Sequence, residues 1–424
     1  MGAACIMRGK VYMIAVGGVG MSALAHLFKE SGYEVSGSDR AVYPPVSDFL
    51  ERIGVPVRTP FSAGNVPRDA DFVIVGNAVS ADNPEVVEVA GSGMRVYSLP
   101  SALSELFMKD TFPVVVAGTH GKTTTTAMVA HLLCHAGLDP SFFVGGIPLN
   151  FGFPARAGRG EHFVIEGDEY DSAYFDKKAK FYHYMPRCLL LTSLEYDHAD
   201  IYPDLAAVRD AFFDLVRMVP EEGLIVACSD YEHVRSVLEE ARCRVLTYAT
   251  RTRDADIFIE PLAAEGGEAR GGVFWGERTF KVGVGIPGVH NMANAVASVA
   301  CAVELGVPLG KALEAMRGFL GVKRRQELLG EAGGIRIVDD FAHHPTAVRE
   351  TIDGGRSFYR PERLVAIFEP RSNTSRRNIF ERDFAEALAR ADLAIICPPH
   401  NPTAIPEKER FSPERVAALI AGMG

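Results

Sequence analysis

Short apolar runs rich in β-branched residues alternate along the chain with longer stretches whose apolar residues follow helical spacing. Runs of this kind, bounded by turn residues, are typical of buried strands. Because parallel neighbouring strands need a crossover, usually a helix, the alternation predicts an α/β fold with parallel sheets. The predicted strands are residues 11–16, 34–37, 72–75, 112–117, 163–166, 188–194, 224–228, 335–338, 364–368 and 394–397.

The alternation divides into three units, which we place at residues 1–108, 109–322 and 323–424. The length of 424 residues agrees with this division, since domains usually have about 100–200 residues. Residues 255–284 break the pattern with short β-like pieces separated by paired glycines, so we expect a small antiparallel addition there. We predict that the first and third units are doubly wound in the manner of a Rossmann fold.

The composition is that of a globular protein, with 47% apolar and 23% charged residues. A net charge of −10 argues against nucleic acid as a partner, because binding to its phosphates needs a basic face. No apolar run approaches the ~18 residues of a membrane helix, and glycines interrupt the apolar stretch near the N-terminus where a signal peptide would be continuous. Seven dispersed cysteines without a CxxC pair favour free thiols in a reducing compartment, so we predict a cytoplasmic protein. Nothing in the pattern indicates an oligomeric state.

A phosphate-loop motif lies between the predicted strand 112–117 and a predicted helix, and it reads Gly118-Thr119-His120-Gly121-Lys122-Thr123-Thr124. Glycines let backbone amides turn toward an anion, and the start of a helix adds the positive end of its dipole. Lys122 is expected to reach the β- and γ-phosphates of ATP, and the Thr123 hydroxyl to bind Mg²⁺. Val116 stands where the common eight-residue motif has glycine, so the match is to a shorter form, GTxGKTT. A glycine-rich turn with a surface lysine is the alternative, but it does not account for Gly-Lys-Thr at a helix start.

Two acidic clusters follow predicted strands of the middle unit, at residues 166–169 and 195–198. The carboxyl ends of neighbouring parallel strands meet at the edge of the sheet where α/β folds bind ligands. Oxygen ligands suit Mg²⁺, which usually keeps waters and phosphate oxygens as its other partners. Glu166 is therefore the first candidate metal ligand and His198 the second. Each cluster taken alone is more often a solvated strand end or a helix cap.

The first predicted strand ends in a glycine-rich turn, and residues 18–23 fit the pattern GxGxxA with Asp39 after the second strand. This is the fingerprint of dinucleotide binding, in which glycines approach a pyrophosphate and the acid binds a ribose hydroxyl. On the motif alone, a plain tight turn is an equally good interpretation. A nicotinamide-dependent oxidoreductase is the corresponding functional alternative, but it leaves the Lys122 loop unexplained.

Four further motifs stand at helix starts or strand ends: residues 290–294, 323–325, 338–345 and 370–374. An asparagine at a helix start caps the helix, and a basic triplet at a domain boundary is usually a solvated linker, so these are the simple interpretations of the first two. In the last motif, Arg371 is a candidate to hold a carboxylate.

In this order, the motifs resemble the Mur ligase family, whose members join amino acids or peptides to UDP-N-acetylmuramic acid in cell-wall synthesis. The resemblance covers nearly the whole chain and rests on residues 17–23, 118–124, 166, 197–198, 290–294, 324–325 and 340–345. It implies a central P-loop ATPase domain between two Rossmann-like domains. It also implies ATP and Mg²⁺ as cofactors and UDP-N-acetylmuramate as a substrate.

The resemblance also implies a role for each motif. The residues expected to bind UDP-N-acetylmuramate are Gly17, Gly18, Gly20, Asp39 and Asn77. Those expected to bind the nucleotide are Gly118, Thr119, His120, Gly121, Lys122, Thr123, Thr124, Asn291 and Asn294. The expected Mg²⁺ ligands are Thr123, Glu166 and His198, and the expected catalytic residues are Lys122, His198, Arg325 and Asp340. Arg371 and His344 are the expected substrate-binding residues of the third unit.

Two branches of the family share the histidine-bearing loop and the His-His-Pro motif. One attaches L-alanine to UDP-N-acetylmuramate, and the other attaches a recycled tripeptide, L-alanyl-γ-D-glutamyl-meso-diaminopimelate. Residues 76–78, 166–171, 174–184 and 370–374 resemble the second branch, so we expect the tripeptide and keep L-alanine as the alternative.

Two points remain open at the level of the sequence. A non-catalytic UDP-sugar-binding protein is a further alternative, which the retained Lys122, Thr123, Glu166 and His198 disfavour. Family members of this type usually continue beyond the equivalent of Gly424, so the third unit is expected to be shortened or to end differently.

Overall fold

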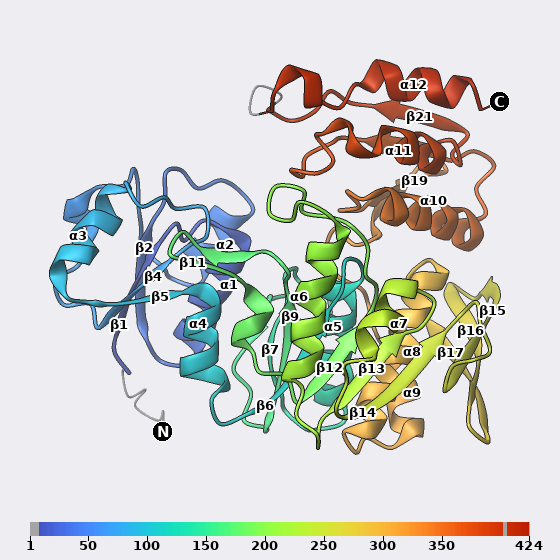
Figure 1. Ribbon diagram of the computed structural model, residues 1–424, viewed down its shortest axis with the longest axis horizontal. Helices are drawn as coiled ribbons and strands as arrows, with labels where there is room; N and C mark the ends of the chain where they lie inside the picture. The colour runs from blue at the N-terminus through green and yellow to red at the C-terminus, as the bar shows by residue number, and fades with distance from the viewer. Residues whose placement is uncertain (1–7, 402–404, 424) are drawn as a thin grey trace.

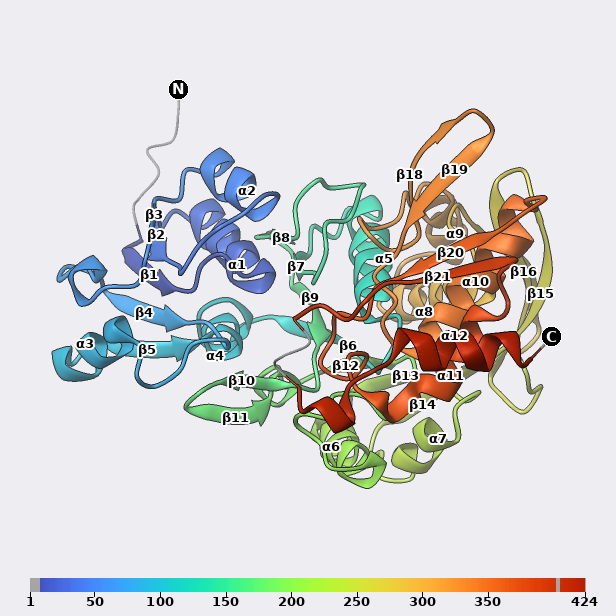
Figure 2. The same ribbon diagram turned by 90° about the horizontal axis from the view of Figure 1, so that it is seen from above.

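The protein consists of three α/β domains in the computed structural model, which describes residues 8–401 and 405–423. The N-terminal domain lies beside the central domain, and the C-terminal domain lies above the central domain in the view of Figure 1. Seen from above, the C-terminal domain covers the part of the central domain that is remote from the N-terminal domain (Figure 2). The predicted α/β architecture with three domains is confirmed.

The N-terminal domain is a five-stranded parallel sheet in the order β3-β2-β1-β4-β5, the order of half a Rossmann fold with its flanking strands. Val11 and Met13 of β1 pack in one core with α1, whereas Tyr12 and Ile14 pack in another with α3, because successive side chains of a strand point to opposite faces. The elements are β1 (Lys10–Ile14), α1 (Val19–Glu30), β2 (Glu34–Ser38), α2 (Val46–Arg52), β3 (Val57–Arg58), β4 (Phe72–Val75), α3 (Pro84–Ser92), β5 (Arg95–Ser98) and α4 (Leu99–Leu103).

The central domain is built on a ten-stranded sheet in the order β17-β16-β15-β14-β13-β12-β6-β9-β7-β8. Its strands are β6 (Phe112–Ala117), β7 (Ser141–Phe143), β8 (Ala155–Arg156), β9 (His162–Gly167), β12 (Cys188–Leu191), β13 (Leu224–Cys228), β14 (Arg244–Ala249), β15 (Ile257–Glu265), β16 (Glu268–Trp275) and β17 (Arg278–Val284). Strands β7, β9, β6, β12, β13, β14 and β15 run parallel. Strands β15, β16 and β17 pair antiparallel, so the predicted antiparallel addition is confirmed as an extension of the main sheet.

Helices cover both faces of the central sheet. Val114 and Val116 of β6 pack in one core with α5 (Lys122–His135), α8 (Val289–Glu304) and α9 (Leu309–Arg317). Val115 faces the other way, into a core that includes α6 (Leu205–Met218), α7 (Glu232–Leu238) and residues of the N-terminal domain. This second core is continuous between the two domains. A hairpin of β10 (Asp171–Ala173) and β11 (Asp176–Ala179) projects beside it toward the N-terminal domain (Figure 2).

The C-terminal domain differs from the predicted pattern in one strand. Predicted strand 335–338 is β19 (Ile335–Asp339), which pairs antiparallel with β18 (Glu327–Ala332) in a separate hairpin. The parallel pair of this domain is β20 (Val365–Phe368) with β21 (Leu393–Ile396), packed on α10 (Pro345–Tyr359), α11 (Glu381–Leu388) and α12 (Pro413–Ala421). Ile367 and Ile395, on the other face of this pair, are 72% and 44% exposed, so the helices cover one face of the sheet only.

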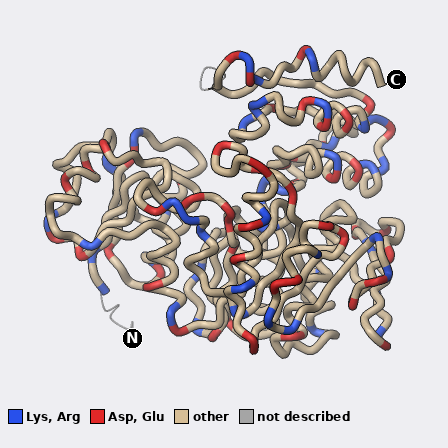
Figure 3. The backbone as a smooth tube through the Cα atoms, in the orientation of Figure 1, with Lys and Arg blue, Asp and Glu red and all other residues tan. Residues whose placement is uncertain are grey.

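Charged residues of both signs are interspersed through all three domains (Figure 3). Within the described ranges, no helix has the length and apolar character that crossing a membrane requires.

Candidate nucleotide and ligase site

The phosphate loop connects β6 to α5 at the carboxyl edge of the central sheet. Gly118 and Gly121 have φ angles of 135° and 79°, which residues with a side chain rarely adopt. The loop is held by the segment after β12, because the amides of Thr119 and His120 donate to the carbonyl and hydroxyl oxygens of Ser193, at 3.2 and 2.8 Å. The first amides of α5 have no acceptor within the helix, and they face the place where a phosphate would bind.

Lys122, the first residue of α5, points back over the loop. Its Nζ donates to the carbonyl oxygen of Gly118 at 2.6 Å and lies 2.9 Å from Oε2 of Glu169. Burial opposes the charge of Lys122, but the carboxylates of Glu169 and Asp168 outweigh burial and raise its pKa. The lysine is therefore a fixed, charged group, whose present partner an entering phosphate would replace.

Glu169 is a buried carboxylate that holds two basic side chains. Besides Lys122, it contacts Nε2 of His198 at 3.2 Å. Burial alone would raise the pKa of Glu169, but Lys122 and His198 lower it to about 2. Burial lowers the pKa of His198, but Glu169 and Asp197 outweigh burial and raise it. The backbone of His198 is left-handed, with φ of 55°. Such strained residues persist where the surrounding structure holds them, often at functional sites.

Glu166, at the end of β9, fits the ligand set of a hard divalent cation. Burial and the neighbouring Asp168 disfavour the charged form of Glu166 and raise its pKa. A bound cation would stabilise this charged form. Oε1 of Glu166 accepts a hydrogen bond from the amide of Gly145 at 2.7 Å, and a Cβ atom at Gly145 would lie 2.8 Å from its Oε2. A Cβ atom at the next residue, Gly146, would lie 3.1 Å from the methyl group of Thr123, so this glycine pair lies against both residues proposed as oxygen ligands. The imidazole of His198 pairs with Glu169 rather than with Glu166.

The C-terminal domain reaches the phosphate loop through Arg325. One terminal nitrogen of Arg325 donates to the hydroxyl of Thr123 at 3.1 Å. Arg325 lies between Arg324 and Gln326, whose φ angles of 59° and 52° are both left-handed, so the linker is bent on either side of it. Asp340 fixes this bend by accepting the amide of Gln326 at 2.8 Å, and burial raises its pKa while Arg325 opposes the shift. Of the two residues of the third unit expected to be catalytic, Arg325 thus contacts the loop directly.

The two asparagines of α8 are both buried, at 4% and 6% exposure. Asn291 donates through Nδ2 to the carbonyl oxygen of Pro287 at 2.7 Å. Asn294 lies against the phosphate loop, since a Cβ at Gly121 would come within 3.0 Å of its side chain. The structure thus brings Asn294 to the loop, whereas the bond of Asn291 is a structural one.

His344 caps the start of α10 and lies beside the phosphate loop. Its ring and that of His120 have centroids 4.6 Å apart, and its Nε2 lies 3.2 Å from the carbonyl oxygen of Tyr196. Burial lowers the pKa of His344 to about 4. Glu195 contacts both rings, with Oε2 at 2.7 Å from Nε2 of His120 and 3.7 Å from Nδ1 of His344.

The predicted substrate residues of the N-terminal domain gather at its glycine turn. Asp39 accepts the amide of Gly17 at 2.8 Å, so the acid and the turn predicted to act together do lie together. Gly18 and Gly20 follow at the start of α1. Asn77 donates to Asp171 of the β10–β11 hairpin at 3.2 Å and so links the N-terminal and central domains.

Arg371 is not brought to the phosphate loop. Its side chain is 56% exposed, and its nearest carboxylate is Glu369 at 3.8 Å. Its loop nevertheless docks on the central domain, because Asn373 donates to Asp200 at 2.7 Å. By contrast, Lys177 and Lys178 belong to the hairpin next to the N-terminal domain, where Lys177 pairs with Asp171 at 2.7 Å. Lys180 follows in a short 3-10 helix and pairs with Asp168 at 3.1 Å.

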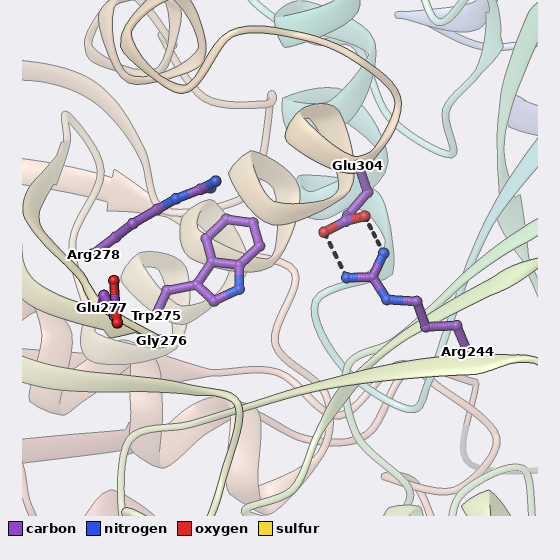
Figure 4. A pocket seen from close by; sticks show the side chains of 6 residues that line it. All are labelled: Arg244, Trp275, Gly276, Glu277, Arg278 and Glu304. Carbon is purple, nitrogen blue, oxygen red and sulfur yellow. Dashed lines mark hydrogen bonds and ion pairs between the residues drawn. The ribbon is translucent and has the colours of Figure 1, made fainter.

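Two hollows accompany these features. One, of about 470 Å³, lies between the central and C-terminal domains, and its lining includes Glu195, Tyr231, His344 and Phe380. The other, of about 410 Å³, lies beside the antiparallel extension and is shown in Figure 4. In the second hollow Arg244 and Glu304 form a double ion pair and Arg278 lies over the ring of Trp275, so its charged groups are mostly satisfied by each other.

Sequence reasoning missed the central position of Glu169, the role of Gly145 and the contact of Glu195 with His120. Glu169 belongs to the predicted acidic cluster 166–169, and its place three residues after Glu166 was the signal that could have indicated it. Gly145 carried no motif.

The pKa of Glu169 predicts a loss of stability in acid. In the unfolded chain a glutamate has a pKa of about 4.3, so the pKa of Glu169 in the folded protein, about 2, is lowered. The stabilisation is complete above the unfolded value and is lost as pH falls from about 4.3 towards 2. We expect the midpoint of urea unfolding to decrease as the pH is lowered through this range, and to decrease less in Glu169→Gln. Glu161→Gln is the control, because the Glu161 side chain is 77% exposed, and equal slopes for both variants would contradict the prediction.

Fold and site together define a P-loop nucleotide-binding domain between two further α/β domains. The chain belongs to the Mur ligase family. The Mur ligase family catalytic domain matches residues 10–110, the Mur ligase middle domain residues 116–302, and the Mur ligase glutamate ligase domain residues 324–422. It is an ATP-dependent, amide-forming ligase of that family.

The chain is similar to members of both branches considered above. It is 37% identical to the UDP-N-acetylmuramate–L-alanyl-γ-D-glutamyl-meso-2,6-diaminoheptandioate ligase of Escherichia coli, over 94% of this chain and 87% of the relative. It is 40% identical to the UDP-N-acetylmuramate–L-alanine ligase of Paenarthrobacter aurescens, over 92% of this chain and 82% of the relative.

Solved structures show the same pattern. A murein peptide ligase from Psychrobacter arcticus is 33% identical with a TM-score of 0.76, and covers 98% of this chain and 88% of its own. A UDP-N-acetylmuramate–alanine ligase from Thermotoga maritima is 27% identical with a TM-score of 0.81, and the match covers 98% of this chain and 89% of the Thermotoga chain.

Proposed function

We propose that this protein joins the tripeptide L-alanyl-γ-D-glutamyl-meso-diaminopimelate to UDP-N-acetylmuramate, with hydrolysis of ATP to ADP and phosphate, in peptidoglycan recycling. The observation that carries the proposal is the 37% identity, over 94% of the chain, to a ligase of that name, together with a complete phosphate loop. Overall identity does not separate the tripeptide from L-alanine, since an alanine ligase reaches 40%. The choice of tripeptide therefore depends on residues 76–78, 166–171, 174–184 and 370–374.

The first step forms an acyl phosphate. A carboxylate oxygen of the muramyl group attacks the γ-phosphorus of ATP, and the bond to ADP breaks. Two anions meet in this step, so catalysis consists mainly of positioning and charge neutralisation. Lys122 and the first amides of α5 supply positive charge on the loop side, and Arg325 supplies it from the C-terminal domain. Mg²⁺, when bound by Thr123, Glu166 and His198, would neutralise the phosphate oxygens further.

The second step forms the amide. The amine of the peptide attacks the acyl carbonyl, phosphate leaves, and the amine loses a proton. Arg371 and His344 are the proposed contacts of the incoming substrate. Asp340 positions Arg325 through the linker, as its bond to the Gln326 amide indicates.

The remaining roles follow the same proposal. UDP-N-acetylmuramate binds at Gly17, Gly18, Gly20, Asp39 and Asn77, and ATP binds at residues 118–124 with Asn291 and Asn294. The domain limits 1–108, 109–322 and 323–424 and the cytoplasmic location also stay predictions. The start of the first domain, at residue 1, and the end of the third, at residue 424, lie outside the described residues.

Mass spectrometry of the product tests the amine. With UDP-N-acetylmuramate and ATP present, we expect kcat/KM for the tripeptide to exceed that for L-alanine by about 100-fold. L-Alanine lacks most of the polar groups of the tripeptide, so the polar groups of a pocket built for the tripeptide would be left unpaired. A preference for L-alanine would assign the protein to the other branch. Phosphate release that does not depend on UDP-N-acetylmuramate, or tight NADH binding without ATPase activity, would overturn the ligase assignment itself.

A further inference from the structure

Three side chains that can bind a metal meet where the C-terminal domain touches the phosphate loop. His120 comes from the loop, Glu195 from the segment after β12, and His344 from the start of α10. One ligand atom of each lies within 4.8 Å of the others. Oε2 of Glu195 is 2.7 Å from Nε2 of His120 and 3.7 Å from Nδ1 of His344. Of the residues that the structure describes, this is the one group of three histidine, cysteine or acidic side chains with this spacing.

The hydrogen bonds of His344 fix which nitrogen can bind an ion. Its Nε2 lies 3.2 Å from the carbonyl oxygen of Tyr196, which can only accept, so Nε2 carries the proton. Nδ1 therefore carries the electron pair, which accepts a hydrogen bond from the amide of Thr346 at 3.3 Å, and this nitrogen lies 3.7 Å from Oε2 of Glu195. An ion bound between the two side chains would take the place of this long hydrogen bond as the partner of Nδ1.

Glu195 is oriented in the way that metal-binding carboxylates usually are. Its other oxygen, Oε1, accepts a hydrogen bond from the hydroxyl of Thr346 at 3.2 Å. Outer hydrogen bonds of this kind to ligating carboxylates, and the carbonyl bond of His344, are typical of protein metal sites. Both residues line the 470 Å³ hollow between the domains, which provides an entry path and room for a water ligand.

Two imidazoles and one carboxylate define the class of ion. Imidazole suits Zn²⁺, Co²⁺ and Ni²⁺, whereas Mg²⁺ prefers oxygen ligands. Three protein ligands with an open fourth position are a common zinc arrangement, with metal–ligand distances of about 2.0–2.2 Å. Ligand atoms of such a tetrahedron lie about 3.3 Å apart, so the observed 2.7 and 3.7 Å need shifts of about half an ångström. The separation of the two histidine nitrogens is within 4.8 Å and needs to shorten by at most about 1.5 Å.

We propose that His120, Glu195 and His344 form a binding site for a divalent transition-metal ion of the Zn²⁺ type, separate from the proposed Mg²⁺ ligands Thr123, Glu166 and His198. A bound ion ties the phosphate loop to the C-terminal domain. It thereby holds these two domains together and withdraws His120 from the nucleotide. Zn²⁺ is in this way an inhibitor of any reaction that requires the domains to part.

Titration with Co²⁺ tests the site without using turnover. The full-length protein is freed of metal with a chelator and titrated in an excess of Mg²⁺, which occupies oxygen-rich sites. We expect one equivalent of Co²⁺ to bind with visible d–d absorption typical of a four- or five-coordinate ion, and to raise the unfolding temperature. Affinity should fall at least about tenfold in Glu195→Gln and in His344→Asn.

The variants are chosen to preserve the fold. Gln can still accept the hydrogen bond from Thr346, and Asn is a good helix cap in place of His344. His233→Ala is the matched control, because His233 lines the same hollow outside the cluster and its loss should leave Co²⁺ binding unchanged. Absence of Co²⁺ binding below about 100 μM, or equal binding by the wild type and both cluster variants, would overturn the proposal.

Discussion

Replacing Lys122 by alanine is expected to lower kcat about 10³-fold. The Lys122 ammonium lies over the loop where the β- and γ-phosphates would bind, and no other described lysine forms a hydrogen bond or ion pair with this loop. Removing one preorganised charge from a transferring phosphoryl group costs about 10²–10³ in rate, or more where that charge dominates. Single-turnover measurement of phosphate release, with UDP-N-acetylmuramate and ATP saturating, isolates the step. A near-normal rate of phosphate release would contradict the proposal that this loop binds the phosphates of ATP.

The same substitution has a second effect, which a double variant separates from the first. Lys122→Ala leaves the buried carboxylate of Glu169 with His198 alone, and breaking a buried pair in this way costs about 3 kcal/mol of the free energy of unfolding. Lys122→Ala with Glu169→Gln should regain most of this stability and none of the turnover. Recovery of turnover in the double variant would mean that the single variant was inactive because it was unfolded.

Gly118→Ala should be the most destabilising single change in the phosphate loop. A Cβ atom there would lie 2.3 Å from Oγ1 of Thr192 and 2.8 Å from the backbone nitrogen and oxygen of Ser193. The backbone of Ser193 cannot move aside, because it also holds Thr119 of the loop. Adding the cost of a positive φ to that of overpacking, we expect a loss of about 3–5 kcal/mol in the free energy of unfolding. Urea unfolding followed by circular dichroism measures it.

Gly137→Ala provides the control for backbone strain alone. Gly137 follows the other end of α5, its φ is 83°, and a Cβ atom there would have open space. Its replacement should cost about 1–2 kcal/mol, the cost of the left-handed conformation without a clash. Equal losses for both variants would show that the fit between Gly118 and Ser193 is unimportant.

The periodicity of the chain predicted the strands that carry continuous buried apolar runs, such as β4, β6 and β12. It missed β5, β7 and β14, which are shorter or only partly buried. The β18–β19 hairpin is a different kind of exception. Ile335 and Ile337 are 68% and 60% exposed, so an apolar strand here does not lie in a buried sheet. An apolar pattern alone cannot distinguish a buried parallel strand from one arm of an exposed hairpin.

The candidate site was predictable where a local motif carries it and not where the fold brings distant residues together. Lys122 and Thr123 are adjacent in one motif. Their partners Glu169 and Arg325 are 47 and 202 residues away, and these pairs exist because β9 lies next to β6 and because the linker after the central domain bends back. Arg371, predicted on its place after a strand, does follow β20, on an exposed loop, and its contact with substrate stays a prediction.

Under the proposed role of Thr123 as a ligand of the cation, its hydrogen bond with Arg325 would couple nucleotide affinity to the position of a whole domain. Arg325 would then have to release the hydroxyl before the cation binds, so the arrangement that receives ATP would be a fraction of the population. The apparent dissociation constant for ATP is then the intrinsic constant divided by that fraction. Changes in the bent linker at Arg324 or Gln326 would therefore tune ATP affinity through the domain equilibrium, without altering any residue that touches the nucleotide.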